Sequence, residues 1–113
     1  MVGICASDMK CWLGGELFWG KDGAGGYVEP LCIAGHEYAG RIVALGEGAA
    51  QKHGVQLGDR VVAELIVPGG ECRFCLSGHY WMCQTHQIFG FTAALNGGMA
   101  RYNRISTRRC GRR

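Results

Sequence analysis

Hydrophobic and polar residues alternate in only a few short stretches of the chain. Residues 38–45 (YAGRIVAL) alternate, are rich in β-branched side chains and end at a glycine-containing turn, which predicts a strand. We expect a second strand over 60–64 (RVVAE), after the turn at Gly58-Asp59, and a third over 98–105 (GMARYNRI). Residues 1–8 (MVGICASD) have the pattern of a strand end. The chain is therefore predicted to be mainly β, with few short helices.

Three other segments lack a regular hydrophobic period. Residues 12–27 mix large aromatic residues with glycine, which predicts a long loop whose aromatic side chains pack on the core or line a cleft. Residues 68–83 carry cysteines among Pro, Gly and Ser, and a metal would order such a loop. Residues 46–51 start like a dinucleotide-binding fingerprint. However, Gln51 replaces the last glycine and no apolar helix follows, so a plain turn is predicted.

Composition narrows the class of protein. A chain of 113 residues has the size of one small domain, and its 20 glycines without a Gly-X-Y period indicate many tight turns rather than a helical bundle. The net charge of +3 comes from arginines in 104–113, which lack interleaved aromatic residues. This segment predicts a basic tail and no nucleic-acid partner. No apolar run reaches the ~18 residues of a membrane span, so we expect no membrane partner.

Cysteine usage indicates metal binding. The odd count of seven cysteines, the Cys-x-x-Cys spacing and the absence of a leader favour thiolate ligands in a reducing compartment over disulfides, so we expect a cytoplasmic protein. Cys11 and Cys32 are interpreted as packing residues, and Cys110 as a free thiol in the tail.

A first group of candidate ligands combines Cys5 with the pair His36-Glu37. Thiolate, imidazole and carboxylate are the ligand types that zinc accepts, and a catalytic zinc uses three protein ligands and leaves one position open. Each half alone is a weak signal, because a lone cysteine usually packs as a small hydrophobe and Gly-His-Glu is usually an exposed turn. The two halves gain weight from their surroundings, GICASD in the first and GHEYAGRIVALGEGA in the second.

Together with GDRVVAE and ECRFCLSGHYWMC, these strings resemble the catalytic domain of zinc-dependent medium-chain alcohol dehydrogenases from about Val2 to Arg101. The details FWG, ECRFC, GHYWMC and FGF are most similar to polyol enzymes of the erythritol or threitol type. The resemblance implies a partial GroES-like β-barrel with a cysteine-rich zinc lobe over 1–103. The basic tail, 104–113, would not be native to that fold.

The resemblance also implies residue roles. Cys5 and His36 would be ligands of a catalytic zinc, with Glu37 a ligand or a close, switchable neighbour. Ser7 would hydrogen-bond the substrate hydroxyl and begin a proton path to solvent. Asp8 would hold the ring of His36 and set its tautomer. The alternative for Asp8 is a carboxylate that only accepts hydrogen bonds from backbone N–H groups.

A second group matches three of the four cysteines in the structural-zinc lobe of this family: Cys72, Cys75 and Cys83. The remaining position is Gly69, which offers no ligand and so excludes a closed site of four thiolates. Three outcomes stay open: a fourth ligand from His79 or His86, a weak site completed by water or Glu71, or an empty lobe.

The activity implied by the family is oxidation of an alcohol or polyol to a carbonyl, with hydride transfer to NAD or NADP. We expect no cofactor-binding residue within this chain, which would lack the opening strands and the nucleotide-binding domain, and we expect the isolated chain to be inactive. A full-length relative would form a homo-oligomer. The competing interpretations are a standalone zinc-binding or interaction module without catalysis, and a remnant that does not fold.

Overall fold

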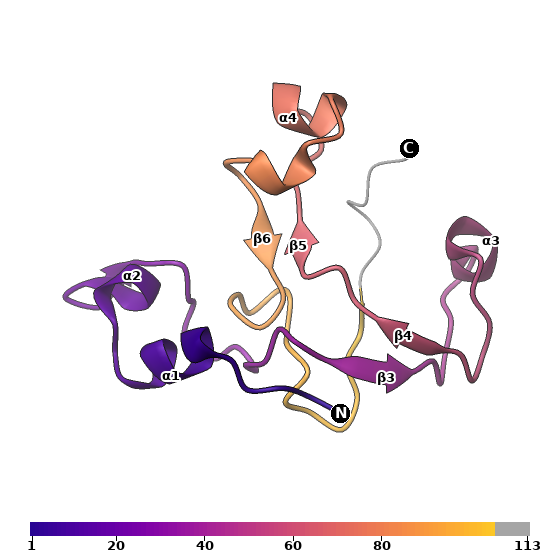
Figure 1. The fold of residues 1–113 in the computed structure, drawn as a ribbon, viewed down its shortest axis with the longest axis horizontal. Coiled ribbons are helices and arrows are strands. Elements are labelled where there is room, and N and C mark those ends of the chain that lie inside the picture. Colours follow the sequence, from indigo (N-terminus) through magenta and orange to yellow (C-terminus); the bar gives the residue numbers. More distant parts are fainter. Residues whose placement is uncertain (106–113) are drawn as a thin grey trace.

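The structure, a computed structural model, describes residues 1–105 and leaves the side chain of Ala24 undescribed. Within this range, three two-stranded antiparallel sheets are joined by loops and short helices (Figure 1). The sheets pair β1 (Gly20–Lys21) with β2 (Ala24–Gly25), β3 (Ala39–Arg41) with β4 (Arg60–Val62), and β5 (Ile66–Val67) with β6 (Gln87–Ile88). The helices are α1 (Ala6–Trp12), α2 (Glu16–Trp19), α3 (Ala49–His53), α4 (Arg73–Leu76) and the 3₁₀ turn η1 (Tyr80–Met82).

These elements lie in three arms around a small centre. Helices α1 and α2 form one arm, β3 and β4 with α3 a second, and β5 and β6 with α4 a third (Figure 1). The radius of gyration is 14.9 Å, against about 13 Å for a compact domain of this length. The chain is thus more open than a closed domain. No helix among residues 1–105 combines the length and the apolar character needed to cross a membrane.

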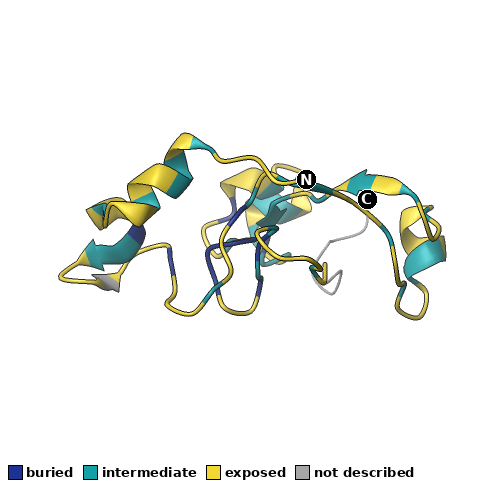
Figure 2. Cartoon of the chain, turned by 90° about the horizontal axis from the view of Figure 1, so that it is seen from below, coloured by how far each residue is buried: buried dark blue, intermediate teal, exposed yellow. Residues whose placement is uncertain are grey.

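The core is small and joins α2 to the loops that carry Val28 and Phe91. Phe18, Val28 and Phe91 form the buried cluster, and the rings of Phe18 and Phe91 meet edge to face at 5.8 Å. Cys11 and Cys32 pack against this cluster, as expected of packing residues. Buried segments are few in Figure 2, and most residues of the arm of α1 and α2 and of the arm of β3, β4 and α3 are exposed. The small core agrees with the low number of regular elements.

The predicted strands over 38–45 and 60–64 form, but they are shorter than expected. The ladder runs from Ala39 opposite Val62 to Arg41 opposite Arg60. The strand predicted over 98–105 is wrong, since none of these eight residues is in a strand. At its start, Gly98 donates a backbone hydrogen bond to Gly35, in a crossing of two loops rather than in a ladder.

Three local predictions are corrected by helices. Residues 6–12 form α1 and not the end of a strand, although Val2 does form a bridge with Tyr38. The loop expected over 12–27 contains α2 and the β1–β2 hairpin, and Trp12 is 86% exposed rather than packed. The turn expected at 46–51 leads into α3, whose five residues are bounded by Gly48 and Gly54 in left-handed conformations. Cys110 and the tail from 106 onward lie outside the described residues.

Candidate metal centres

The first centre is built on the start of α1. Cys5 is the N-cap residue, and its Sγ accepts a hydrogen bond from the backbone N–H of Ser7 at 3.3 Å. In return, Asp8 Oδ2 accepts a hydrogen bond from the backbone N–H of Cys5 at 2.8 Å. This reciprocal capping satisfies N–H groups that have no partner within the helix. It also places the side chains of Ser7 and Asp8 beside Cys5.

The second half of this centre reaches Cys5 through backbone pairing. The N–H of Gly3 donates to the carbonyl of Glu37 at 2.7 Å, and Val2 bridges Tyr38. Gly35 precedes the histidine with φ of +93°, in a region that side chains rarely adopt. The pairing therefore brings residues 2–5 beside residues 36–38.

Cys5, His36 and Glu37 converge as the sequence predicted. One ligand atom from each of these residues lies within 4.8 Å of the others. His36 Nε2 is 3.1 Å from Cys5 Sγ and 3.1 Å from Ser7 Oγ, and Ser7 Oγ is 2.7 Å from Cys5 Sγ. One sulfur, one nitrogen and one carboxylate oxygen are a donor set that fits a zinc ion. A hydroxyl group lies beside that set.

The other edge of the His36 ring faces Asp8. His36 Nδ1 is buried without a hydrogen-bond partner and lies 3.7 Å from Asp8 Oδ1. The ring also packs on Phe91, with centroids 5.1 Å apart. Asp8 therefore does two things, because Oδ2 caps α1 while Oδ1 faces the histidine. This arrangement fits an imidazole that presents Nε2 to a metal and Nδ1–H to a carboxylate.

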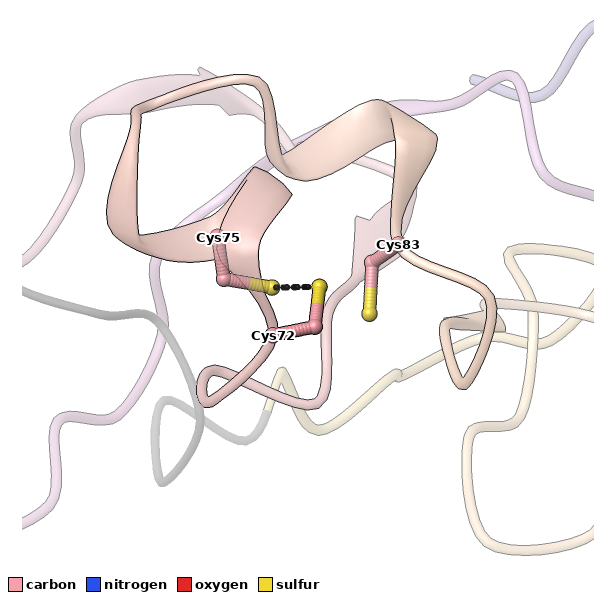
Figure 3. A group of neighbouring side chains, drawn as sticks. All are labelled: Cys72, Cys75 and Cys83. Atoms are coloured by element: carbon pink, nitrogen blue, oxygen red, sulfur yellow. Dashed lines mark hydrogen bonds between the residues drawn. The ribbon is translucent and has the colours of Figure 1, made fainter.

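The second centre lies in the lobe that follows β5. Cys72 is the N-cap of α4, Cys75 lies within α4, and Cys83 follows η1. Their three Sγ atoms lie within 4.8 Å of one another, and Cys72 Sγ is 3.4 Å from Cys75 Sγ (Figure 3). Because β5 pairs with β6, the two ends of the lobe are held together and Cys83 returns to the Cys-x-x-Cys turn.

The environment of Cys83 favours its thiolate. Hydrogen bonds from the Thr85 hydroxyl and the Gly69 backbone N–H, against an opposing effect of burial, lower the pKa of Cys83 to about 6. The two contacts measure 3.5 Å from Thr85 Oγ1 and 3.4 Å from Gly69 N. Burial instead raises the pKa of Cys75. Thr85 is not among the residues predicted from the sequence, although a hydroxyl two residues after a candidate thiolate is a signal that would have found it.

The two histidines considered as a fourth ligand, His79 and His86, make other contacts. His79 Nδ1 lies 3.1 Å from Ser77 Oγ, and His86 Nδ1 contacts the carbonyl of Cys83. Over residues 1–105, no histidine, aspartate or glutamate joins the three cysteines within 4.8 Å. The lobe therefore presents three thiol groups as a set, with neither histidine nor Glu71 among them.

Comparison with known proteins shows which family the chain belongs to. Residues 1–112 match the family model described as the alcohol dehydrogenase GroES-like domain. The chain belongs to this family. It is 50% identical over 101 residues to the erythritol/L-threitol dehydrogenase of Mycolicibacterium smegmatis, covering 89% of this chain and 28% of that protein. The predicted resemblance to alcohol dehydrogenases, and to polyol enzymes among them, is confirmed.

Two further similar proteins are also dehydrogenases. The sorbitol dehydrogenase of Bacillus subtilis is 36% identical over 102 residues, covering 89% of this chain and 26% of that enzyme. The crystal structure of the D-arabinose dehydrogenase from Sulfolobus solfataricus superposes with a TM-score of 0.65 at 32% identity, covering 87% of this chain and 26% of that one. The chain thus spans about a quarter of the length of the relatives it matches.

Proposed function

We propose that this chain supplies the catalytic-zinc ligands of an NAD- or NADP-dependent alcohol or polyol dehydrogenase, which oxidises a hydroxyl group to a carbonyl. The observation that carries this proposal is the convergence of Cys5, His36 and Glu37 within 4.8 Å. Ser7 and Asp8 lie against the same histidine. The identity of 50% to an erythritol/L-threitol dehydrogenase supports a small polyol as the substrate class.

Each of the five residues at this centre has a part in the proposal. Zinc, when bound by Cys5, His36 and Glu37, would lower the pKa of a substrate hydroxyl toward neutrality. Ser7 Oγ, 3.1 Å from His36 Nε2, would accept the hydroxyl proton and pass it toward solvent. Asp8 would keep the proton of His36 on Nδ1, so that Nε2 stays available as a donor to the metal. Glu37, which is exposed, would act as a ligand or a replaceable neighbour.

The rest of the enzyme would come from segments beyond this chain. We place a partial GroES-like barrel with its zinc lobe over 1–103 and a basic tail over 104–113, in a cytoplasmic protein. A dinucleotide-binding domain would hold the nicotinamide on the far side of the cleft, and the assembled enzyme would be a homo-oligomer. The isolated chain would then bind metal without oxidising an alcohol. The expected inactivity is tested by mixing the purified 113-residue chain with erythritol and NAD or NADP. Reduction of the cofactor would contradict this expectation.

A chimera tests the proposed chemistry. The matching segment of the erythritol/L-threitol dehydrogenase is replaced by this chain, and polyol oxidation is followed through nicotinamide absorbance. We expect the chimera to oxidise erythritol or threitol, and we expect Cys5→Ser to abolish both turnover and the catalytic zinc. Ser7→Ala should keep the zinc but lower kcat by about 100-fold or more, as loss of a proton-transfer group does.

The same chimera separates the proposal from its alternative. A zinc-binding module without catalysis would give the same metal content in the isolated chain, so metal content alone does not decide between them. A chimera that folds, binds zinc at Cys5 and His36, and still oxidises no polyol would support the module and overturn the enzyme. Gln51→Ala, a change at an exposed position of α3 away from both centres, serves as the matched control.

A further inference from the structure

The lobe of Cys72, Cys75 and Cys83 is a candidate site whose chemistry differs from that of a closed zinc centre. A structural zinc is almost always held by four protein ligands in a tetrahedron. Here the three Sγ atoms gather within 4.8 Å, and no histidine or carboxylate of the described chain completes the set. Figure 3 shows Cys72 and Cys75 on the turn that includes α4, and Cys83 facing them from the segment that follows η1. The metal preference of the lobe therefore depends on which group occupies the fourth position of the coordination tetrahedron.

Gly69 and Thr85 occupy the space beside Cys83. A Cβ atom placed on Gly69 would lie 3.7 Å from Cys83 Sγ, so a side chain at this position would begin beside that sulfur. The same atom would lie 2.4 Å from Thr85 Oγ1, which shows that the hydroxyl already fills that space. Gly69 contributes only a backbone N–H that donates to Cys83 Sγ at 3.4 Å. An N–H donor cannot bind a cation, and a neutral hydroxyl is a poor ligand for one.

A set of three thiolates with a blocked fourth corner suits a soft ion of low coordination number. Zn(II) would have to recruit water or distort the loop to complete its tetrahedron. Cu(I) is monovalent, prefers thiolate sulfur and is satisfied by three ligands. Cys83 is buried, with 1% of its surface exposed, so its sulfur is shielded from water, whereas Cys72 and Cys75 are partly exposed. We propose that Cys72, Cys75 and Cys83 form a three-thiolate site that binds Cu(I) in preference to Zn(II).

The test is a metal competition on the full 113-residue chain under anaerobic, reducing conditions. Every variant also carries Cys5→Ser, which removes the other centre. Cu(I), buffered by a chromophoric chelator, and Zn(II) are titrated separately, and X-ray absorption counts the sulfur neighbours of copper. We expect tight Cu(I) binding with three sulfur neighbours, lost in Cys83→Ser. We expect Zn(II) affinity to rise by about tenfold or more when Gly69→Cys is combined with Thr85→Ala, because a fourth thiolate closes the site.

The matched control is Gly69→Ala combined with Thr85→Ala. It adds the same Cβ and removes the same hydroxyl but supplies no thiol, so it should keep the preference for Cu(I). Equal Zn(II) affinity with and without the added cysteine would overturn the proposal. So would copper binding that survives Cys83→Ser. Should the cysteine variant misfold, X-ray absorption on the chain with Gly69 still decides, because a nitrogen neighbour from His86 or His79 would refute a site of three thiolates.

Discussion

His36 shows how single atoms define the catalytic-zinc candidate. Its Nε2 faces Cys5 Sγ and Ser7 Oγ, while its Nδ1 is buried without a hydrogen bond, 3.7 Å from Asp8 Oδ1. A buried nitrogen without a partner is unfavourable unless a small movement gives it one. Metal binding at Nε2 would leave the proton on Nδ1, where a shift toward Asp8 satisfies it.

We predict that Asp8→Asn lowers the zinc affinity of the Cys5 centre by about 10- to 100-fold, as changes in groups that orient a ligand do. Asparagine keeps an oxygen that can accept the hydrogen bond from Cys5 N–H, so α1 should still begin at the same place. Competition with a zinc chelator measures the affinity, and circular dichroism checks the helix content. Unchanged affinity would show that Asp8 only caps the helix.

At the scale of structural elements, the position of His36 depends on two loops that cross each other, residues 33–35 and residues 97–99. Gly97 N–H donates to Ile33 O and Gly98 N–H to Gly35 O, both at 2.7 Å. A Cβ on Gly97 would lie 2.1 Å from Gly35 O, which is backbone and cannot rotate away. This close approach explains why a segment with a strand-like pattern forms a loop crossing instead. It also connects Gly97 to the residue next to His36.

We predict that Gly97→Ala lowers the free energy of unfolding by about 1–3 kcal/mol, because the added methyl group forces two backbones apart. Gly40→Ala is the matched control, since nothing lies within 4 Å of its Cβ position and its φ is not positive. That change should be neutral or stabilise the chain by up to about 1 kcal/mol. Urea denaturation of both variants measures the difference. If the two variants have equal urea midpoints, the contact between the two loops does not stabilise the chain.

As a whole, the molecule exposes much apolar surface and buries little. Among residues 1–105, six hydrophobic residues are buried, whereas Leu31 is 99% exposed and Leu76 78% exposed. The radius of gyration of 14.9 Å fits this open arrangement. A core of this size supplies little net stability, so bound metal would contribute a large part of the folding free energy.

We predict that zinc stabilises the chain through the Cys5 centre. At free zinc near one hundred times the dissociation constant, the free energy of unfolding should rise by about 2.7 kcal/mol. A chelator should remove the increase, and Cys5→Ser should prevent it. Urea denaturation at buffered zinc concentrations gives both values. An unfolding midpoint that is independent of zinc would contradict the centre.

The sequence by itself determined the candidate ligands and the family. Cys5, His36 and Glu37, and the cysteines at 72, 75 and 83, were named from ligand chemistry, spacing and resemblance, and the structure brings each group together. The strands around Ala39 and Val61 were found because alternation over a half-buried ladder is a local property. The family and the two strands are confirmed because their signals lie in residue type and short spacing, and the roles of the candidate metal ligands stay predictions.

Tertiary structure alone decided the rest. The helix after Cys5 depends on a reciprocal cap between Cys5 and Asp8, which periodicity does not report. The loop at 98–105 depends on two glycines that meet a backbone more than sixty residues away along the chain. The corner at Gly69 is filled by Thr85, a side chain that approaches only because β6 returns beside β5. Contacts between distant segments are fixed by packing and backbone pairing, and a local pattern carries no record of which segments will meet.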